Sequence, residues 1–224
     1  MINVAASVDG KIDTVERHGA AISSAADRER VDRLRAEVDA VMVGGRTLLE
    51  EDPRLVVRSA ELRAERVARG APPNPAKVGV VSRATLRPDA RFLSHGPARI
   101  ILCVPASTPE SELQPLRARG VEVVCHGRGR VDLAAALETL WQLGMRRVLV
   151  EGGGTLNFEL LRLRLVDELQ VFIAPLIFGG ALAPSLADGA GLARAAAITL
   201  HRLSVQPFDD GGLLLRYALA EPNT

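Results

Sequence analysis

Residues 148–155 read Val-Leu-Val-Glu-Gly-Gly-Gly-Thr, and this short stretch indicates the fold class. The apolar run predicts a buried strand over 147–150, and the residues after the glycines predict a helix over 155–163. Glycines at such a turn let backbone N–H groups approach a ligand closely, and the start of a helix favours a bound phosphate. The turn therefore indicates a nearby anion or dinucleotide, although a tight turn without any ligand explains the glycines equally well.

Outward from this stretch, strands and helices alternate through two thirds of the chain, and strands alone finish it. This order predicts an α/β fold with a mainly parallel central sheet, flanking helices and an antiparallel C-terminal edge. Residues 1–224 are expected to form one domain. Strands are expected at 2–8, 40–43, 78–81, 99–104, 121–124, 147–150, 167–178, 198–205 and 212–218. Helices are expected from Ser23 or Ser24 to Glu37 and at 47–51, 109–119, 132–143 and 155–163, with a helical turn at 60–68.

Composition argues against several classes of protein. The 224 residues carry a net charge of +1 with acids and bases interspersed, which disfavours a nucleic-acid partner. No apolar run approaches the ~20 residues that span a bilayer, and no basic leader precedes Ile2, so a cytoplasmic protein is expected. The four histidines lack metal-ligand spacing, so no metal site is expected. Cys103 and Cys125 are interpreted as buried thiols in preference to a disulfide.

A second glycine turn, Val43-Gly44-Gly45-Arg46-Thr47, has the same arrangement of strand, turn and helix. Two such turns at strand ends resemble the phosphate-binding turns of a dinucleotide site at a topological switch. Arg46 is a candidate for the additional phosphate that distinguishes NADPH from NADH. Read alone, however, Arg46 is an exposed helix residue.

Lysine is rare in this chain: Lys11 and Lys77 are the only two among 28 basic residues. A lysine kept in so arginine-rich a sequence suggests chemistry that guanidinium cannot perform, because an amine can lose its proton. Lys11 follows the turn Ser7-Val8-Asp9-Gly10 and is the candidate for proton transfer. The alternative is a surface lysine after a turn.

The run Glu50-Glu51-Asp52 places three carboxylates in succession before Pro53. Neighbouring carboxylates repel one another, which can raise the pKa of a partly buried one toward a proton-transfer role. The alternative is a solvated acidic turn. Both Glu51 and Asp52 are kept as candidates.

Taken together, these motifs resemble the reductase family of riboflavin biosynthesis, both the stand-alone archaeal-type enzyme and the C-terminal half of the bacterial bifunctional deaminase-reductase. Any one motif is weak, but their order and spacing from residue 5 to about 190 are specific. The matching stretches are Ala6–Ile12, Leu34-Arg35, Val38-Asp39, Val43–Thr47, Asp52–Leu55, Gly127–Asp132, Glu151–Asn157, Leu165–Leu169 and Ala174–Gly180.

This resemblance implies a dihydrofolate-reductase-like fold and a homodimer. It also implies NADPH-dependent reduction of 2,5-diamino-6-ribosylamino-4(3H)-pyrimidinone 5′-phosphate to the ribitylamino compound. The ribosylamine must open to an imine before C1′ accepts hydride. Opening moves protons at the ring oxygen and the exocyclic nitrogen, and an ammonium with a carboxylate can supply this transfer.

The resemblance also assigns residues to roles. Lys11 and Glu151 lie at the reacting end, together with Glu51 or Asp52. Ser23, Arg35 and Arg58 meet the ribose phosphate, for which a bidentate guanidinium is well suited, and Leu55 packs on the pyrimidine. The positions on the NADPH side are Gly44, Gly45, Arg46, Thr47, Gly152, Gly153, Gly154, Thr155 and Leu156.

Two departures from the family leave the substrate open. The position that usually holds Asp, four residues after Thr47, holds Glu51, and the usual Asp near Val81 is Ser82. One alternative is a reductase of the same fold that acts on another pteridine or pyrimidine. The second is a non-catalytic nucleotide-binding paralogue. For the dimer, the apolar segment Leu169–Phe178 is the candidate interface, unless it is buried within the monomer.

Overall fold

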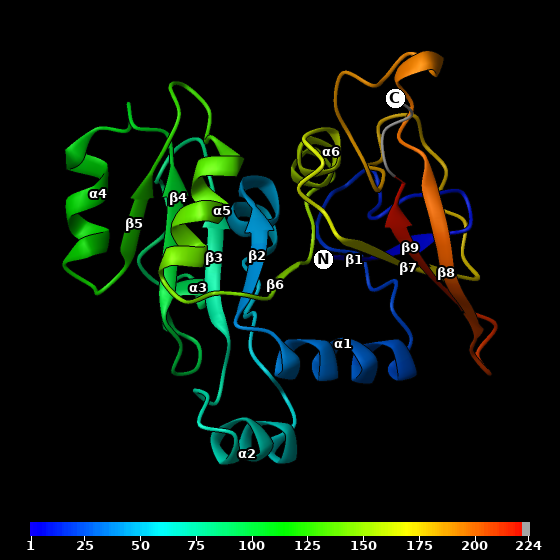
Figure 1. Ribbon diagram of the computed structural model, residues 1–224, viewed down its shortest axis with the longest axis horizontal. Helices are drawn as coiled ribbons and strands as arrows, with labels where there is room; N and C mark the ends of the chain where they lie inside the picture. The colour runs from blue at the N-terminus through cyan, green and yellow to red at the C-terminus, as the bar shows by residue number, and fades with distance from the viewer. Residues whose placement is uncertain (221–224) are drawn as a thin grey trace. The chain divides into compact units, whose positions relative to one another are not determined.

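The computed structural model describes residues 1–220, which fall into two compact units (Figure 1). Unit 1 combines residues 1–29 with the chain from residue 150 onward, and unit 2 comprises residues 30–149. The mixed α/β class is confirmed, because parallel strand pairs dominate and the antiparallel pairs involve only the last strands. The expectation of a single domain over residues 1–224 stays a prediction.

Unit 2 is built on a sheet of parallel strands. The strands pair in the order β2, β3, β4 and β5, each parallel to the next. Residues of β2, β3 and β4 are mostly buried, as expected for a parallel sheet that is covered on both faces, and apart from Lys77 in β3 they are apolar or glycine. Helices α4 and α5 contact β5 (Figure 1). The bounds are β2 Ala40–Gly44, η1 Thr47–Glu51, α2 Ala60–Ala68, β3 Ala76–Val80, α3 Arg91–Ser94, β4 Ile100–Val104, α4 Glu110–Arg117, β5 Glu122–Cys125 and α5 Leu133–Gln142.

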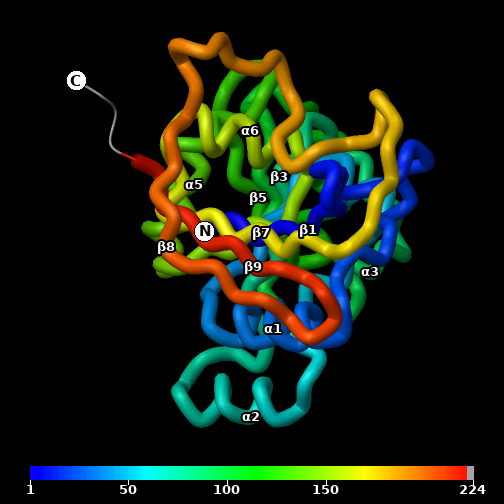
Figure 2. Tube along the Cα trace, turned by 90° about the vertical axis from the view of Figure 1, so that its right-hand side faces the viewer, coloured from blue at the N-terminus to red at the C-terminus, as the bar shows by residue number. Residues whose placement is uncertain are grey.

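Unit 1 is built around β1 and β7, which pair in parallel over their whole length. Strand β9 adds antiparallel to β7, and β8 adds antiparallel to β9 (Figure 2). Residue Val150 at the end of β6 pairs with Ile2. Helix α1 runs from unit 1 into unit 2. The bounds are β1 Ile2–Ser7, α1 Ala25–Glu37, β6 Val148–Val150, α6 Gly154–Arg162, β7 Glu168–Ala174, η2 Arg194–Ala196, β8 Leu200–Pro207 and β9 Leu213–Leu219.

Every strand and helix expected from the sequence is present, with its ends shifted by a few residues. Strand β7 ends at Ala174 because Pro175 cannot donate to a strand ladder. The helical turn at 47–51 is a π-helix, and the turn at 60–68 is the complete helix α2. The short helix α3 was not expected from the sequence.

The apolar or small residues Ala26, Val31, Leu34 and Val38 in the sequence predict one buried face for helix α1, and that prediction is partly wrong. Ala26 is exposed, whereas Asp32 and Ala36 are buried on this helix. Asp32 tolerates burial because its two carboxylate oxygens accept hydrogen bonds from the N–H groups of Arg58 and Ser59. A pattern based on apolar residues misses a buried carboxylate of this kind.

The segment proposed as a dimer interface, Leu169–Phe178, lies mostly inside unit 1. Strand β7 has a partner on each side, β1 and β9, and Leu169, Val171 and Phe172 are buried. The structure therefore favours the alternative for this strand, which is burial within the monomer. Only the end of the segment is accessible, with Ile177 strongly exposed.

Both cysteines are free thiols. In the parallel register of β4 and β5, Cys103 lies opposite Val124, and Cys125 lies opposite Val104. Directly paired residues project from the same face of a sheet, so the two thiols lie on opposite faces. This geometry separates their sulfur atoms by the sheet, and the preference for thiols over a disulfide is confirmed.

Candidate active site

The turn after β1 is held by its own polar side chains. The amide of Lys11 donates to Ser7 Oγ at 3.0 Å, and the amide of Ser7 donates to the carbonyl of Lys11 at 2.8 Å. Asp9 accepts from Ser7 Oγ at 2.6 Å and from the amides of Phe178 and Gly179. The Ser7 hydrogen bond, helped by the two amides, lowers the pKa of Asp9 despite some desolvation. The turn is therefore anchored to residues 178–179 by a stable carboxylate.

The Lys11 side chain lies against a second distant segment. Its Nζ donates to the carbonyl of Ala183 at 3.1 Å, and its backbone forms an antiparallel bridge with Ser185. The next amide, Ile12, donates to the carbonyl of Pro184 at 3.0 Å. An ammonium has three donors, so the contact with Ala183 fixes the side chain and leaves capacity for a ligand.

The glycine turn after β6 meets the same segment. Gly152 and Gly153 have φ values of 128° and 87°, in the region that favours glycine. A Cβ on Gly154 would lie 2.4 Å from the carbonyl oxygen of Ser185 and 2.9 Å from Asp188 Oδ2. The close approach at Gly154 is thus made by the protein itself. Because residues 183–188 contact both Lys11 and Gly154, two predicted parts of the site share one scaffold within unit 1.

Helix α6 begins immediately after this turn and offers a site for an anion. Gly153 is the N-cap residue and has no side chain with which to cap the helix. The first N–H groups of a helix need partners from outside the helix, and a phosphate can supply them. Thr155 is exposed, whereas Leu156 is buried in the helix packing. Glu151, between the strand and the glycines, is half-buried.

The second glycine turn, in unit 2, also packs closely on its own sheet. Gly44 ends β2 and lies opposite Val80, and a Cβ on Gly45 would lie 3.3 Å from the carbonyl oxygen of Val80. Arg46 is exposed and precedes the π-helix, a rare element that often marks functional sites. Thr47 is its first residue. Nothing in this turn decides between a cofactor contact and the turn's own packing.

Asp52 ends the acidic run and caps a helix. Its Oδ2 accepts from the amide of Arg91 at 2.9 Å, and its Oδ1 accepts from the amide of Phe92 at 3.1 Å. Desolvation alone would raise its pKa, but these two amides and the charges of Arg91 and Arg87 outweigh it and lower the pKa. The expected raised pKa is therefore wrong for Asp52. The reason is that α3, unseen in the sequence, supplies the N–H donors.

An open pocket of about 410 Å³ lies within unit 2 and contains several predicted substrate residues. Arg35, Leu55 and Arg58 all line it. Its other lining residues were not expected from the sequence. These are Arg54, Val56, Val57, Arg63 and His95.

One wall of this pocket, residues 54–58, is held by hydrogen bonds to its backbone carbonyls. Arg35 Nη1 donates to the carbonyl of Val56 at 3.0 Å. Arg63 Nη1 donates to the carbonyls of Val57 and Arg58 at 2.8 and 2.7 Å. Leu55 has a φ of 51° and is only 1% exposed, an unusual backbone conformation for a leucine. Such conformations persist where surrounding contacts fix them, often at functional sites.

Lys77, the second lysine, is completely buried in β3. Its Nζ donates to the carbonyls of Phe92 and His95 at 3.0 and 2.5 Å, at the end of α3. Burial lowers the pKa of Lys77 to about 8, although the charge of Asp52 opposes this effect. Lysine rarity singled out this residue, but its role in the structure is to bind the end of α3.

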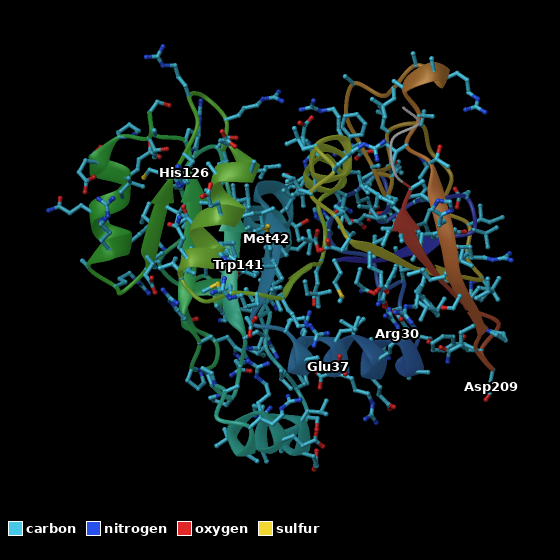
Figure 3. The ribbon with its side chains drawn as sticks, in the orientation of Figure 1. Arg30, Glu37, Met42, His126, Trp141 and Asp209 are labelled. Atoms are coloured by element: carbon cyan, nitrogen blue, oxygen red, sulfur yellow. The ribbon has the colours of Figure 1, made fainter. Side chains whose placement is uncertain are left out.

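Other predicted residues have simpler surroundings. Ser24, not Ser23, caps α1, because Ser24 Oγ accepts from the amide of Asp27. Ser23 offers its carbonyl to Arg28 at 2.7 Å. His126, labelled in Figure 3, is 2.7 Å from Thr139 Oγ1 through Nε2, which gives it a structural partner. No group of three or more possible metal ligands occurs in residues 1–220, and no described helix is long and apolar enough to cross a membrane.

Comparison with known proteins adds independent information. The family model described as "RibD C-terminal domain" matches residues 1–214. A protein of Archaeoglobus fulgidus named 2,5-diamino-6-ribosylamino-4(3H)-pyrimidinone 5′-phosphate reductase is 45% identical over 84% of this chain and 85% of its own length. A protein of the same name from Methanothermobacter thermautotrophicus is 42% identical over 86% of this chain and 84% of its own length.

Solved structures agree on the fold. A pyrimidine reductase-like protein of Corynebacterium diphtheriae has a TM-score of 0.80 at 21% identity, covering 98% of this chain and 91% of that one. RibD of Acinetobacter baumannii has a TM-score of 0.78 at 26% identity, covering 98% of this chain and 57% of that one. The expected dihydrofolate-reductase-like fold is confirmed. By sequence and by structure, this chain belongs to the RibD C-terminal domain family.

Proposed function

We propose that this protein is an NADPH-dependent reductase of riboflavin biosynthesis. It reduces 2,5-diamino-6-ribosylamino-4(3H)-pyrimidinone 5′-phosphate to the ribitylamino product. The names of the archaeal relatives support this substrate. The observation in the structure that carries the proposal is the arginine-lined pocket of unit 2, which suits a sugar phosphate.

Lys11 and Glu151 are assigned to proton transfer. The Lys11 ammonium donates a proton to the ring oxygen while the Glu151 carboxylate accepts one from the exocyclic nitrogen, so that the C1′–O bond breaks and a C1′=N bond forms. Bound NADPH supplies the hydride that C1′ accepts, and a proton then returns to the nitrogen. The anchored position of Lys11, with Nζ on the carbonyl of Ala183, supports a fixed donor.

Glu51 is the better catalytic candidate of the two acids in the run. Asp52 uses both oxygens on the amides of α3, and its lowered pKa makes it a poor proton carrier. Glu51 is half-buried, and its backbone carbonyl accepts from Arg91 Nη2 at 2.7 Å. We therefore assign a positioning role to Asp52 and leave proton exchange in this unit to Glu51.

The pocket residues are assigned to the substrate's ribose phosphate and base. Arg35 and Arg58, which line the pocket, bind the phosphate. Ser23 belongs to unit 1, and its assignment to the phosphate rests on the family resemblance alone. Leu55 is kept as the candidate for the pyrimidine because it lines the pocket, but at 1% exposure its side chain offers little surface for that contact. Each guanidinium contact to a dianion contributes about 1.5–3 kcal/mol.

The two glycine turns fit a dinucleotide. In unit 1, Gly152 and Gly153 are assigned to a phosphate, followed by Gly154, Thr155 and Leu156 at the start of α6. Asp188 already lies beside Gly154, so the contact falls to the earlier glycines. In unit 2, Gly44, Gly45 and Thr47 contact the cofactor, and Arg46 binds the 2′-phosphate. Arg46→Ala should raise KM for NADPH about tenfold and leave KM for NADH unchanged.

The test is turnover with the purified protein. NADPH oxidation is followed by absorbance with the ribosylamino phosphate as substrate, and mass spectrometry checks for a product heavier by two hydrogens. Lys11→Met should lower turnover about 10²- to 10⁴-fold. Arg17→Met is the matched control, because Arg17 also donates to a carbonyl of the same segment, Leu182, at 2.7 Å. NADPH binding without turnover would favour the paralogue, and oxidation only with another pteridine would favour a different substrate.

A homodimer is proposed as the working assembly. Strand β8 runs along the edge beside β9 (Figure 2). Leu203 and Val205 of β8 are exposed, as is Leu213 of β9. Apolar side chains on an unpaired edge strand favour pairing with a second copy. Leu203→Lys together with Val205→Lys should shift the molecular mass measured by light scattering from dimer to monomer. An unchanged dimer would place the interface elsewhere.

A further inference from the structure

His95 lines the arginine pocket, and neither its sequence context nor the family resemblance gives it a role. It follows α3 directly and is exposed at the pocket wall. Its amide donates to the carbonyl of Arg91 at 2.9 Å. Most histidines in surface connections have no binding role. A binding role for His95 requires that its backbone be held rigidly at the pocket.

The backbone is fixed at three successive residues. The carbonyl of His95 accepts from Lys77 Nζ at 2.5 Å, and the carbonyl of Pro97 accepts from Asn74 Nδ2 at 3.1 Å. Between them Gly96 has a φ of 72°, and a Cβ there would lie 3.0 Å from Val56 Cγ1. The chain at the pocket mouth therefore cannot shift without breaking buried contacts.

The same buried side chains tie this wall to the opposite one. Asn74 Oδ1 accepts from the amide of Val57 at 3.0 Å while its Nδ2 holds Pro97. Asn74 and Lys77 are both buried. A site that must recognise a ligand needs its binding groups locked by such supporting contacts. A free loop needs no buried ammonium, which is costly to desolvate.

The charges of the pocket indicate the ligand. Four arginines line it, Arg35, Arg54, Arg58 and Arg63, and the described lining contains no acidic residue. Asp32 lies 3.7 Å from Arg58 Nε and offsets part of this charge. A dianion such as a phosphate monoester matches this surplus.

We propose that His95 is a further phosphate ligand, which donates an imidazole N–H to the sugar phosphate, and that Lys77 is its positioning residue. A neutral imidazole has one N–H donor, so the contact does not require a charged ring. The ligand's identity rests on the proposed function. The binding of a sugar phosphate by the pocket can be measured without turnover.

The binding experiment uses ribose 5-phosphate as the probe, with unphosphorylated ribose for comparison. The chain has only four histidines, so imidazole NMR signals can be assigned by comparison with His95→Gln. Ribose 5-phosphate, but not ribose, should shift the His95 signal in wild type. His95→Ala should weaken its affinity about tenfold or more, His95→Gln should restore most of it, and His201→Ala, on the exposed strand β8, should change nothing.

The kinetic experiment uses the ribosylamino substrate. His95→Ala should raise KM by the same factor and leave kcat unchanged, because phosphate is remote from the reacting carbon. An affinity for ribose 5-phosphate within twofold of wild type in His95→Ala would overturn the proposal. If wild type shows no turnover but His95 still governs phosphate binding, the proposed function fails and this inference stands.

The positioning role of Lys77 is tested by measuring whether the effects of Lys77→Met and His95→Ala on KM add. Lys77→Met should raise KM in the wild-type background and raise it no further in the His95→Ala background, because it acts through His95. Equal increases in both backgrounds would show a general structural effect and remove Lys77 from the proposal. If Lys77→Met does not fold, Lys77→Gln keeps an N–H donor and serves in the same cycle.

Discussion

The only two lysines of the chain lie in opposite surroundings, one in each unit. Lys11 is half-buried in a turn after β1, and its Nζ donates to one carbonyl, that of Ala183. Lys77 lies inside β3, is 0% exposed, and donates to two carbonyls at the end of α3. Both ammonium groups thus bind backbone oxygen. Carbonyl contacts alone do not distinguish a proton donor from a structural cation.

What distinguishes the two is the remaining donor capacity and the access to it. Lys11 keeps donors beside a glycine turn that shares its scaffold, whereas Lys77 is enclosed by the pocket wall it supports. The rarity of lysine suggested chemistry that guanidinium cannot perform. For Lys11 that stays a prediction, whereas the structure gives Lys77 a structural contact with the end of α3.

The largest expected effect separates the lysines by catalysis. Lys11→Met removes the proposed proton donor and should lower kcat about 10²- to 10⁴-fold, the usual contribution of acid–base catalysis. The thermal midpoint should stay close to that of wild type, because the side chain is only half-buried and its hydrogen bond is with the carbonyl of Ala183. Steady-state kinetics and calorimetry measure both. A Lys11→Met enzyme that keeps more than a tenth of the wild-type kcat would show that Lys11 is not the proton donor.

The second effect separates them by stability against pH. Burial lowers the pKa of Lys77 to about 8 in the folded protein, from the ordinary lysine value of 10.5. Between these values the unfolded chain binds more protons, so the free energy of unfolding rises with pH, by about 3 kcal/mol in total.

Lys77→Met removes this titration and provides the reference. Urea unfolding from pH 7 to 11 should therefore show the free energy of unfolding of wild type rising relative to that of Lys77→Met. Burial raises the pKa of Cys103 to about 12, so its contribution to the free energy of unfolding falls over pH 9–12. This contribution is the same in wild type and Lys77→Met, and the comparison cancels it. A difference that does not vary with pH would mean that Lys77 titrates normally.

The third effect concerns Asp52, the carboxylate that holds the opposite end of α3 from Lys77. Asp52→Ala leaves two buried amides without their acceptor and should cost about 1–3 kcal/mol. The pKa of Asp52 is lowered from the ordinary aspartate value of 3.8, so the stabilisation is complete above pH 3.8 and is lost as the pH falls below it. Denaturant titrations at pH 7 and pH 3 check this. An equal deficit at both pH values would contradict a titrating contact.

The smallest effect concerns Asp9, which anchors the Lys11 turn in the way that Asp52 anchors α3. Asp9→Ala releases the amides of Phe178 and Gly179 and should lower kcat up to about tenfold through misplacement of Lys11. Asp9→Asn, which keeps an acceptor, should lose less. A normal kcat in Asp9→Ala would mean that Ala183 alone positions the lysine.

Much of the fold could be predicted because the signals are local. Apolar runs bounded by glycine or proline marked every strand, and Pro175 marked the end of β7. The parallel sheet followed from the alternation of strands and helices. Helix α3 has only four residues and no apolar periodicity, so its existence depends on Asp52 and Lys77, which are distant in sequence.

The candidate site was predictable only in part, for the same reason. The resemblance to a family supplied Arg35, Leu55 and Arg58, and the structure gathers them in one pocket. It could not supply His95 or the Lys77 and Asn74 contacts, because these form between residues that share no motif. The pKa of Asp52 was predicted in the wrong direction, since the sequence showed its acidic neighbours but not the amides that bind it.

Leu55 has a consequence for reshaping this enzyme. Its left-handed backbone costs about 1–2 kcal/mol that a glycine would not pay. A buried leucine side chain returns about 1.5–3 kcal/mol, so the two quantities nearly cancel. Leu55→Gly is therefore a starting point for enlarging the pocket to accept a bulkier heterocycle. The packing energy lost with the side chain is offset in part by relief of the backbone strain.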